Sequence, residues 1–440
     1  MRMYDIIDKK KKGKELSDEE IRYMINGYVD GSIPDYQMSA FLMAVYYMGM
    51  SDNELLEMTI AMEKSGDIVD LSAISGIKVD KHSTGGVGDK TTLVVGPVVA
   101  ACGGKVAKMS GRGLGFTGGT IDKLESIPGY RIDISEREFY DNVNNIGVSI
   151  IGQSAEIATA DKKLYALRDV TATVDSIPLI ASSIMSKKLA SGSDKIVLDV
   201  TVGSGAFMKS VEDAISLASK MVTIGEGAGK ETVAYITNMD IPLGVSVGNN
   251  LEVIEAIETL NGNGPDDFNE ICIQFSAEML CLAGKGKIEE CKIMAKEAIN
   301  NGSALKKFSD MVQAQGGNKD YIYDIDMFDK ALYSEKWIAE KDCYIEHMDT
   351  EICGKTSVIL GAGREIKESD VDYTAGIKFY KKTGDFIKKG DVIAELFSSD
   401  KDKIKQAISF LKNGYRFGDK QVEKQKTIIA FVSSSGVVFL

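Results

Sequence analysis

Cysteine, histidine and long apolar runs are scarce in this 440-residue chain, and each scarcity excludes a class of protein. The six cysteines include no Cys-x-x-Cys pair, which argues against a disulfide framework and a zinc site and indicates a reduced, cytoplasmic chain. No apolar run approaches the roughly 20 residues of a membrane span, and the lysine-rich N-terminus lacks the apolar segment of a secretory signal. We therefore expect a soluble, untargeted protein with no membrane partner. Only His82 and His347 are available for imidazole chemistry.

Length and charge exclude further classes. A chain of 440 residues exceeds the roughly 250 to 300 that one hydrophobic core supports, so we expect two or three domains. The composition is 44% hydrophobic and 27% charged, which is typical of a globular chain and excludes disorder. The 52 basic and 65 acidic residues give a formal net charge of −13, and a phosphate backbone repels such a chain. We therefore expect no nucleic acid partner.

The hydrophobic pattern divides the chain into regions of different type. It is helical over 5–64 and again over 162–190. From residue 77 short β-branched runs alternate with helix-like stretches, and after residue 344 strands and turns dominate. Alternation of that kind is typical of a mainly parallel sheet, so the predicted fold class is α/β with a separate all-helical domain and a C-terminal, β-rich α+β domain. The predicted boundaries are 1–65 plus 162–192 for the helical domain, 70–155 plus 193–330 for the α/β domain, and 345–440 for the C-terminal domain.

Local start signals support the helical assignments. Ser17 and Ser51 each precede acidic residues at the start of a helical pattern, where serine is a favoured N-cap. Ser176 is a plausible N-cap for a later helix, with Pro178 in its first turn. The Gly-Asp punctuation of the C-terminal region also resembles lipoyl or biotinyl carrier domains. Because a carrier needs a Met-Lys-Met tripeptide that this region lacks, structural hairpins are the better interpretation.

The densest chemical signal is the segment K-H-S-T-G-G-V-G-D-K, residues 81–90, directly after a strand-like run. Its glycines let backbone N–H groups approach an anion, its hydroxyls add donors, and a helix beginning near Asp89 would add its positive end. The spacing fits neither a Walker loop nor G-x-G-x-x-G. Taken alone, an ordinary glycine turn is the simpler interpretation of this candidate phosphate cradle.

A second segment of the same kind, residues 108–122, carries five glycines and three hydroxyls after another strand-like run. Gly113, Gly115 and Gly118 fit G-x-G-x-x-G, and Asp133 follows about 20 residues after the first of them, so a dinucleotide site is an alternative. Loops at consecutive strand ends face one ligand across the carboxyl edge of a parallel sheet. Together the two loops predict an oxyanion site of phosphate size.

A third segment, residues 165–175, contributes Arg168 and leads into the helix that carries Ser183 and Lys187. These last two residues lie four apart on one helical face, so a hydroxyl and an ammonium can point into one cleft. Arg168 would add a planar fork of donors suited to the carbonyl oxygens of an imide-like edge. Taken singly, Arg168 and Lys187 are better explained as solvated charges.

Three unbroken stretches make the chain similar to the pyrimidine-nucleoside and thymidine phosphorylases. They are S-G-R-G-L-G-F-T-G-G-T-I-D-K-L-E at 110–125, K-H-S-T-G-G-V-G-D at 81–89 and R-D-V-T-A-T-V-D-S-I-P-L-I at 168–180. The resemblance implies a nucleoside phosphorylase/phosphoribosyltransferase-type catalytic domain and a homodimer formed through the helical domain. It also implies reversible phosphorolysis of uridine, thymidine and deoxyuridine to the free base and a pentose 1-phosphate, with a pyrimidine nucleoside and inorganic phosphate as partners.

The same resemblance assigns roles to individual residues. His82 is similar to a histidine proposed to donate a proton or hydrogen bond to the pyrimidine, and with an ordinary pKa near 6.5 it would be charged for a useful fraction of the time at neutral pH. His347 is expected to be structural. Chain crossings near Ser65, Ser154 and Ser191 would act as hinges for domain closure. The implied phosphate ligands are Lys81, Ser83, Thr92, Lys108, Met109, Ser110 and Thr120, and the implied base-binding residues are Arg168, Ser183 and Lys187.

Some members of the family bind a potassium ion near the phosphate loop, and the resemblance places its ligands on Gly88, Leu243, Ser246 and Glu255. Lys90 occupies a further ligand position in that loop. If the position contributes a carbonyl oxygen, the potassium site survives; if it needs a hydroxyl, the ammonium of Lys90 replaces the cation. No organic cofactor is expected, and inorganic phosphate serves as co-substrate.

Three rival functions stay open at this point. The nearest is a strict thymidine phosphorylase, because the shared motifs do not separate the two activities. A phosphoribosyltransferase of the anthranilate type is a second, and a non-catalytic binding protein or growth factor-like activity is a third. Every position of the phosphate and base sets carries a competent side chain, which favours the phosphorylase.

Overall fold

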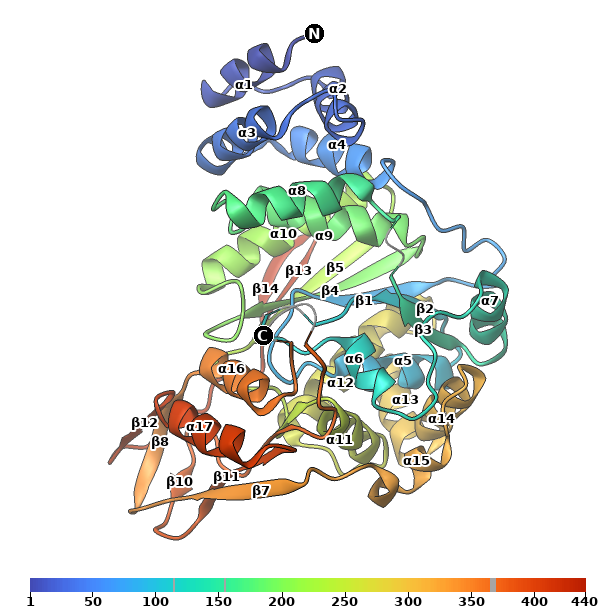
Figure 1. Ribbon diagram of the computed structural model, residues 1–440. Coiled ribbons are helices and arrows are strands. Elements are labelled where there is room, and N and C mark those ends of the chain that lie inside the picture. Colours follow the sequence, from blue (N-terminus) through green and yellow to red (C-terminus); the bar gives the residue numbers. More distant parts are fainter. Residues whose placement is uncertain (114, 154–155, 365–368) are drawn as a thin grey trace.

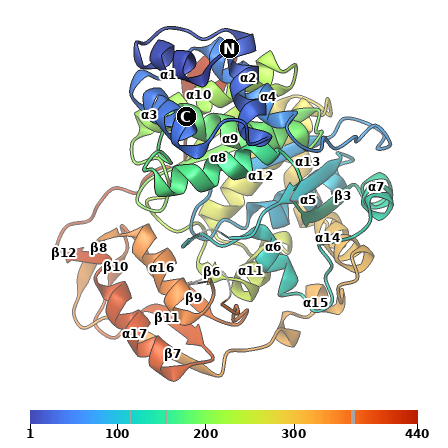
Figure 2. The same ribbon diagram turned by 45° about the horizontal axis from the view of Figure 1, so that its top comes forward.

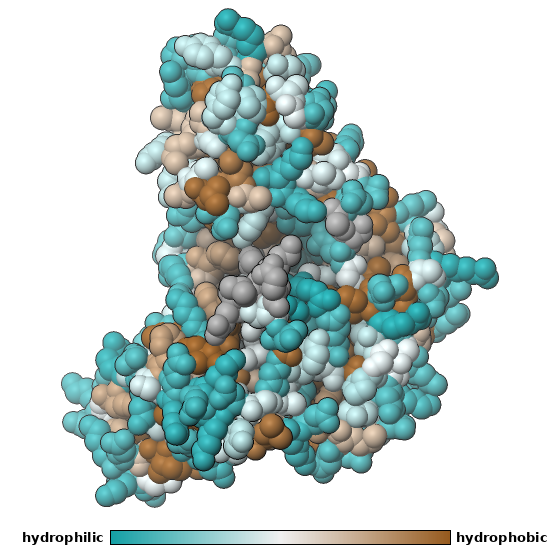
Figure 3. Space-filling model, viewed as in Figure 1, coloured by the Kyte–Doolittle hydropathy of each residue, from teal (hydrophilic) through white to brown (hydrophobic). Residues whose placement is uncertain are grey.

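The computed structural model describes residues 1–113, 115–153, 156–364 and 369–440. Three lobes meet around a central sheet: a helical lobe at the top of Figure 1, an α/β lobe below it, and a C-terminal lobe at the lower left. Figure 3 shows the same three lobes in a space-filling view from the same side. Within the described ranges, every helix is too short or too polar to cross a membrane.

The helical lobe consists of four N-terminal helices and two later ones. Capping boxes start two of the helices, with Ser17 accepting from the backbone N–H of Glu20 and Ser51 from that of Glu54, as predicted. Figures 1 and 2 place the two later helices between the N-terminal four and the central sheet. The helices are α1 (Met3–Lys11), α2 (Asp18–Val29), α3 (Asp35–Met48), α4 (Asp52–Glu63), α8 (Thr159–Val170) and α9 (Ile177–Ala190).

The central sheet has the order β1-β4-β5-β13-β14. Its first three strands are parallel, and the last two run antiparallel to their neighbours. A separate parallel pair, β2-β3, is joined to the start of β1 by a bridge between Lys78 and Lys105. The strands are β1 (Val79–Ser83), β2 (Val106–Ser110), β3 (Val148–Gly152), β4 (Lys195–Val202), β5 (Glu231–Asn238), β13 (Ile428–Ser433) and β14 (Gly436–Phe439).

Both faces of the central sheet are covered, so its strands are apolar on both sides. Alternate residues such as Ile196 and Leu198 enter the core shared with the helical lobe, whereas Val197 enters the core of the α/β lobe. The helix α10 (Val211–Gly227) covers the first face. The remaining helices of the lobe are α5 (Thr91–Ala101), α6 (Thr120–Glu125), α7 (Glu136–Asn145), α11 (Asn250–Leu260), α12 (Asp266–Leu282), α13 (Ile288–Asn300), α14 (Ser303–Ala314), α15 (Asp320–Tyr323) and the 3-10 turn η1 (Ile325–Met327).

In its described residues, 333–364 and 369–418, the C-terminal lobe contains two small antiparallel sheets and two helices. One sheet has the order β6-β9-β11-β7 and the other β10-β8-β12. The first of these sheets takes its edge strand β6 from the α/β lobe. The elements are β6 (Ser246–Gly248), β7 (Tyr333–Ile338), β8 (Cys343–Met348), α16 (Thr350–Leu360), β9 (Gly376–Phe379), β10 (Phe386–Ile387), β11 (Val392–Ser398), α17 (Lys401–Lys412) and β12 (Tyr415–Gly418).

The structure departs from the predicted extent of the C-terminal domain at both ends. The prediction assigned all of 345–440 to that domain, but β13 pairs with β5 and brings the last hairpin into the central sheet. At the other end β7 pairs with β11 although it begins at Tyr333. Both differences arise because strand pairing joins segments that are distant along the chain, which local hydrophobic patterns do not report.

Candidate active site

A cavity of about 360 Å³ opens at the carboxyl ends of β1, β2 and β3 and reaches the helices α8 and α9. This is the edge at which open α/β sheets place ligands. The structure brings together in its lining every residue predicted for the phosphate, the base and the imidazole: Lys81, His82, Ser83, Thr92, Lys108, Met109, Ser110, Thr120, Arg168, Ser183 and Lys187.

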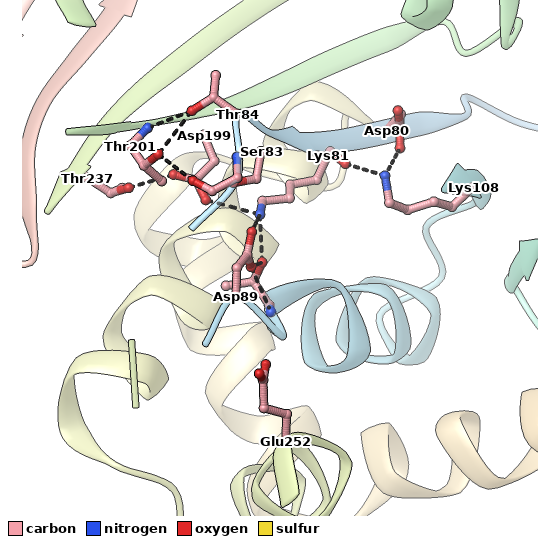
Figure 4. Close-up of polar contacts among 12 residues, drawn as sticks. Asp80, Lys81, Ser83, Thr84, Asp89, Lys108, Asp199, Thr201, Thr237 and Glu252 are labelled. Atoms are coloured by element: carbon pink, nitrogen blue, oxygen red, sulfur yellow. Dashed lines mark hydrogen bonds and ion pairs between the residues drawn. The ribbon is translucent and has the colours of Figure 1, made fainter. Parts of the chain in front are cut away.

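Alternation along β1 sends its polar side chains to opposite sides of the sheet. Figure 4 shows Asp80 pointing toward Lys108, while Lys81 points the other way, toward Asp89. Asp80 is bonded on the side of the helical lobe, and Lys81 on the side of α12 and the cradle. One strand therefore contributes charged groups to two separate networks.

The first network fixes the ammonium of Lys81. Its Nζ donates to the hydroxyl of Thr91 at 2.6 Å and lies 3.1 Å from a carboxylate oxygen of Asp199 and 3.7 Å from one of Asp89 (Figure 4). Burial alone would lower the pKa of Lys81, but the Asp89 and Asp199 carboxylates raise it above its ordinary value. Lys81 is therefore a permanently charged group at the floor of the cradle.

The second network surrounds Asp80. Its carboxylate lies 3.0 Å from Nζ of Lys108 on β2 and 2.9 Å from Nζ of Lys188 on α9. Burial would raise the pKa of Asp80, yet these two ammonium groups hold it well below the usual range. Burial lowers the pKa of Lys108 to about 8, and Asp80 counteracts that effect only in part. The charge of Lys108 therefore responds to pH within the range that enzymes experience.

His82 lies partly buried between these lysines. Burial lowers its pKa well below 6.5, and the ammonium groups of Lys188 and Lys108 lower it further. The expectation that His82 is charged for a useful fraction of the time at neutral pH is therefore wrong for the phosphate-free site. An uncharged imidazole can still donate a hydrogen bond from its remaining N–H.

The loop that forms the cradle after β1 lies close to neighbouring parts of the α/β lobe, and glycine makes this possible. A Cβ atom on Gly86 would lie 2.3 Å from the terminal methyl of Met239, and Gly85 adopts a φ of +102°. Thr201 on β4 holds the loop from the side, since its hydroxyl donates to the carbonyl of Gly85 at 2.5 Å and its N–H donates to Thr84. These contacts keep the backbone of the cradle against the sheet edge.

Two carboxylates of α6, Asp122 and Glu125, hold the second glycine segment, and both accept from Arg112. Asp122 accepts the backbone N–H of Gly113 at 2.7 Å and the guanidinium of Arg112 at 3.0 Å. The C-terminal lobe also contributes to this site, because Arg364 donates to the same carboxylate at 2.9 Å. Asp122 is therefore a junction between the second loop and the C-terminal lobe.

The base-directed side chains come from α8 and α9. The guanidinium of Arg168 donates to the carbonyl oxygens of Thr173, Val174 and Leu179, so part of the predicted fork is already used within its own loop. Lys187 Nζ lies 3.3 Å from the hydroxyl of Ser183, as the four-residue spacing predicts, and 2.5 Å from a carboxylate oxygen of Asp161. Asp161 thus fixes the direction in which Lys187 points.

Three of the four residues assigned to potassium by the resemblance direct their oxygens to an ammonium instead. Lys90 Nζ lies 2.9 Å from the carbonyl oxygens of Leu243 and Ser246 and 3.3 Å from a carboxylate oxygen of Glu255. The carbonyl of Gly88 accepts the backbone N–H of Lys90 at 3.0 Å. A potassium ion would have to share these oxygens with a buried positive charge, so the residues present do not fit it. The structure favours the second of the two alternatives drawn from the sequence.

Sequence reasoning missed several charged residues of the site, among them Asp80, Asp161 and Lys188. Asp80 directly precedes the cradle motif and Lys188 directly follows Lys187, so proximity to a motif was the only available signal. Their partners are distant along the chain, with Asp80 and Lys188 separated by 108 positions. The predicted hinge residue Ser154 lies outside the described residues.

Comparison with models of known protein families defines the class of protein to which the chain belongs. The α/β domain of the glycosyl transferase family matches residues 75–305, and the helical bundle domain of the same family matches residues 4–66. The pyrimidine nucleoside phosphorylase C-terminal domain matches residues 344–418. The fold and site are thus those of a pentosyl-transferring enzyme.

Curated relatives identify the family within this class of enzymes. A pyrimidine-nucleoside phosphorylase of Geobacillus stearothermophilus is 52% identical over 93% of this chain and 95% of its own. Those of Staphylococcus haemolyticus and Bacillus subtilis are each 52% identical over 91% of this chain and 92% of their own. The chain belongs to the pyrimidine-nucleoside phosphorylase family.

Among solved structures, anthranilate phosphoribosyltransferase of Thermus thermophilus superposes with a TM-score of 0.57 at 17% identity. The match covers 70% of this chain and 98% of the other. At that identity the likeness shows the fold alone. It confirms the predicted phosphoribosyltransferase-type architecture of the catalytic part.

Proposed function

We propose that the cavity catalyses reversible phosphorolysis of uridine, thymidine and deoxyuridine. The observation that carries this proposal is that cationic, hydroxyl-bearing loops of the α/β lobe and the Arg168, Ser183 and Lys187 cluster of the helical lobe line one cavity. A nucleoside bound there has its sugar between an anion site and a cluster of donors suited to a heterocycle.

The chemistry needs two electrostatic contributions. One phosphate oxygen forms a bond to C1′ of the pentose while the bond from C1′ to N1 of the pyrimidine breaks, and the electron pair of that bond leaves on the base. The products are the pyrimidine and an α-pentose 1-phosphate, with inversion at C1′. Lys81 and Lys108 bind the phosphate, and Lys187 stabilises the negative charge that develops on the base.

His82 acts in this scheme as an uncharged donor. Its lowered pKa means that the imidazole keeps one N–H for a hydrogen bond to a carbonyl oxygen of the pyrimidine and does not transfer a full proton. The departing pyrimidine anion then takes its proton from water. Bound phosphate, as a nearby anion, would raise the pKa of His82 and strengthen this hydrogen bond.

The substrate range is argued from the relatives. The three quoted relatives are named for pyrimidine nucleosides in general, which favours the broad enzyme over a strict thymidine phosphorylase. The test is to compare phosphate-dependent release of uracil from uridine and thymine from thymidine by liquid chromatography. We expect both reactions, each at a rate that depends on added phosphate. Release of thymine alone would establish the strict enzyme.

The two other candidate functions, a phosphoribosyltransferase and a non-catalytic binding protein, predict different results when phosphate and nucleoside are added. A phosphoribosyltransferase would be inactive with phosphate and nucleoside and would need a pyrophosphorylated sugar with a divalent metal. A non-catalytic binding protein would bind nucleoside and phosphate without releasing base. The same chromatographic assay separates both from the phosphorylase.

We propose that the helical lobe closes on the α/β lobe when both substrates bind. Two contacts next to the predicted hinges support this proposal: the hydroxyl of Ser65 accepts the N–H of Ala160 at 2.8 Å, and the N–H of Val69 donates to the carbonyl of Ala190, which precedes Ser191. Small-angle scattering should show a smaller radius of gyration with phosphate plus a pyrimidine than with buffer. Identical dimensions would contradict closure.

We also propose a homodimer in the cytoplasm. Tyr4 on α1 and Tyr36 and Tyr47 on α3 are 65%, 74% and 75% exposed, which is unusual for large aromatic side chains and supports an interface through the helical lobe. Analytical ultracentrifugation of Tyr47→Asp against wild type tests this. All six cysteines lie within the described ranges and are free thiols, which agrees with a reducing compartment.

A further inference from the structure

We infer that the ammonium of Lys90 is the built-in monovalent cation of this protein, and that it holds the phosphate cradle in shape without bound potassium. The side chain is fully buried behind the cradle. The inference concerns the cation site only and does not depend on which nucleoside the enzyme accepts.

The ammonium has a complete set of partners. It carries three N–H donors, and three oxygens face it: the carbonyls of Leu243 and Ser246 at 2.9 Å each and the Glu255 carboxylate at 3.3 Å. The ring of Phe268 lies below it, 5.2 Å from Nζ to the ring centroid, and adds a cation–π contact. A second cation placed among the same oxygens would meet a like charge in a site closed to water, where repulsion is poorly screened.

The surrounding chain is shaped to this ammonium. Glu255 accepts the N–H groups of Val245 at 2.9 Å and Ser246 at 2.6 Å, so its charge is fixed in place. Gly244 has a φ of +68°, and a Cβ atom there would lie 2.9 Å from Lys90 Nζ and 1.8 Å from Glu255 Oε1. Only glycine leaves room for the pair at this position.

Lys90 connects three parts of the molecule through this contact. It directly precedes Thr91, whose hydroxyl accepts from Lys81 in the cradle, and Thr92, which lines the cavity. Ser246 lies on β6, which pairs with β9 of the C-terminal lobe. The ammonium therefore fixes the start of α5 against the strand that carries the C-terminal lobe. Because it is covalently attached, it cannot dissociate as the salt changes, whereas the stabilisation by a bound ion depends on the concentration of that ion relative to its dissociation constant.

The first test uses the full-length wild-type protein and needs no nucleoside. Melting temperature is measured by calorimetry in potassium chloride and in tetramethylammonium chloride at equal ionic strength, and retained potassium is measured by atomic emission after desalting. We expect equal melting temperatures and no stoichiometric potassium. A melting temperature that rises specifically with potassium, or one potassium per chain, would overturn the inference.

The second test separates charge from volume. Lys90→Ala leaves room for an ion, and Lys90→Met fills the space without a charge. We expect both to lower the melting temperature and raise the phosphate KM about tenfold or more, with potassium restoring Lys90→Ala and not Lys90→Met. The exposed Lys296→Ala is the matched control and should behave as wild type. A Lys90→Met protein with the stability and phosphate KM of wild type would sink the idea, and the wild-type measurements decide it if either variant does not fold.

Discussion

Asp80 on β1 and Lys188 on α9 form a buried ion pair of 2.9 Å that joins the α/β lobe to the helical lobe. The other oxygen of the same carboxylate pairs with Lys108 on β2 at 3.0 Å. Two ammonium groups are thereby concentrated around a single carboxylate, and His82 lies in their combined field. The contact between the two lobes and the protonation of the imidazole are therefore linked.

We expect His82 in the phosphate-free protein to remain neutral well below pH 6.5, because burial and the ammonium groups of Lys188 and Lys108 lower its pKa. With only two histidines, nitrogen NMR of labelled imidazoles resolves it, and His347→Gln provides the assignment. Lys188→Met should raise the pKa of His82, and Lys162→Met, which changes an exposed lysine of α8, should not. A His82 signal that titrates near 6.5 in the wild type would contradict the assignment of its charge state.

The same shift has a consequence for stability. Between the lowered folded pKa and the unfolded value of about 6.5, the unfolded chain binds a proton that the folded chain does not, so this group's contribution to stability is lost as pH falls through that window. The loss is at most about 1.4 kcal/mol per pH unit. His82→Gln should show a shallower decrease in the free energy of unfolding from pH 6.5 to 5 than His347→Gln, measured by urea titration.

We expect phosphate binding to weaken above pH 8. Burial lowers the pKa of Lys108 to about 8, so its ammonium loses its proton in that range and the cradle loses one positive charge. The phosphate KM should rise with pH by up to about tenfold per unit. Lys108→Met should raise the KM at pH 7 by about ten- to a hundredfold and abolish this rise. A profile that is unchanged in Lys108→Met would exclude Lys108 as its source.

Lys187 and its partner Asp161 should affect the base side of the reaction. Lys187→Met removes the charge that stabilises the departing pyrimidine, so we expect kcat/KM for uridine to fall about 10²- to 10³-fold while the phosphate KM changes little. Asp161→Asn keeps the ammonium but loosens its direction, and a smaller decrease in kcat is expected. The exposed Lys162→Ala is the control. An equal effect on the phosphate KM would show that Lys187 acts on the phosphate side of the sugar and would contradict its assignment to the base.

The C-terminal lobe should influence phosphate binding through Arg364. Arg364→Ala removes one of the two guanidinium groups on Asp122 and leaves the contact of that carboxylate with Gly113. We expect a phosphate KM raised a few-fold with little change in melting temperature, because partly exposed ion pairs contribute about 1 kcal/mol or less. Arg416→Ala, in an exposed pair of the same lobe, is the matched control. Equal effects from both variants would show that the contact with Asp122 is not the cause.

The parts of the site that the sequence predicts are those written in short contiguous segments. Glycine loops that follow strand-like runs define the cradle, and a four-residue helical spacing places Ser183 near Lys187. Some charged pairs of the interior are different, because they join residues more than a hundred positions apart, as Asp80 and Lys188 do. Which ammonium meets which carbonyl depends on how the lobes pack, and hydrophobic periodicity carries no such information.

The same difference between local and long-range features applies to the fold. Capping serines correctly predict the starts of α2 and α4, because each serine and the backbone N–H group that it caps lie within four residues along the chain. The pairing of β13 with β5 depends on a return of the chain over almost two hundred residues, which no local pattern encodes. The helices α16 and α17 were likewise hidden among the turn signals of a region that the sequence presents as mainly strand.

After β12 the chain returns to the central sheet, and this return determines which lobe of the enzyme can move relative to the others. The C-terminal lobe leaves the α/β lobe before β7 and rejoins it at β13, and it also borrows β6 for its own sheet. It is thus connected to the α/β lobe at both covalent ends and along the shared strand β6, so a rotation of it would disrupt the pairing of β6 with β9. In the proposed closure we therefore expect the α/β and C-terminal lobes to move together, with the helical lobe moving against them.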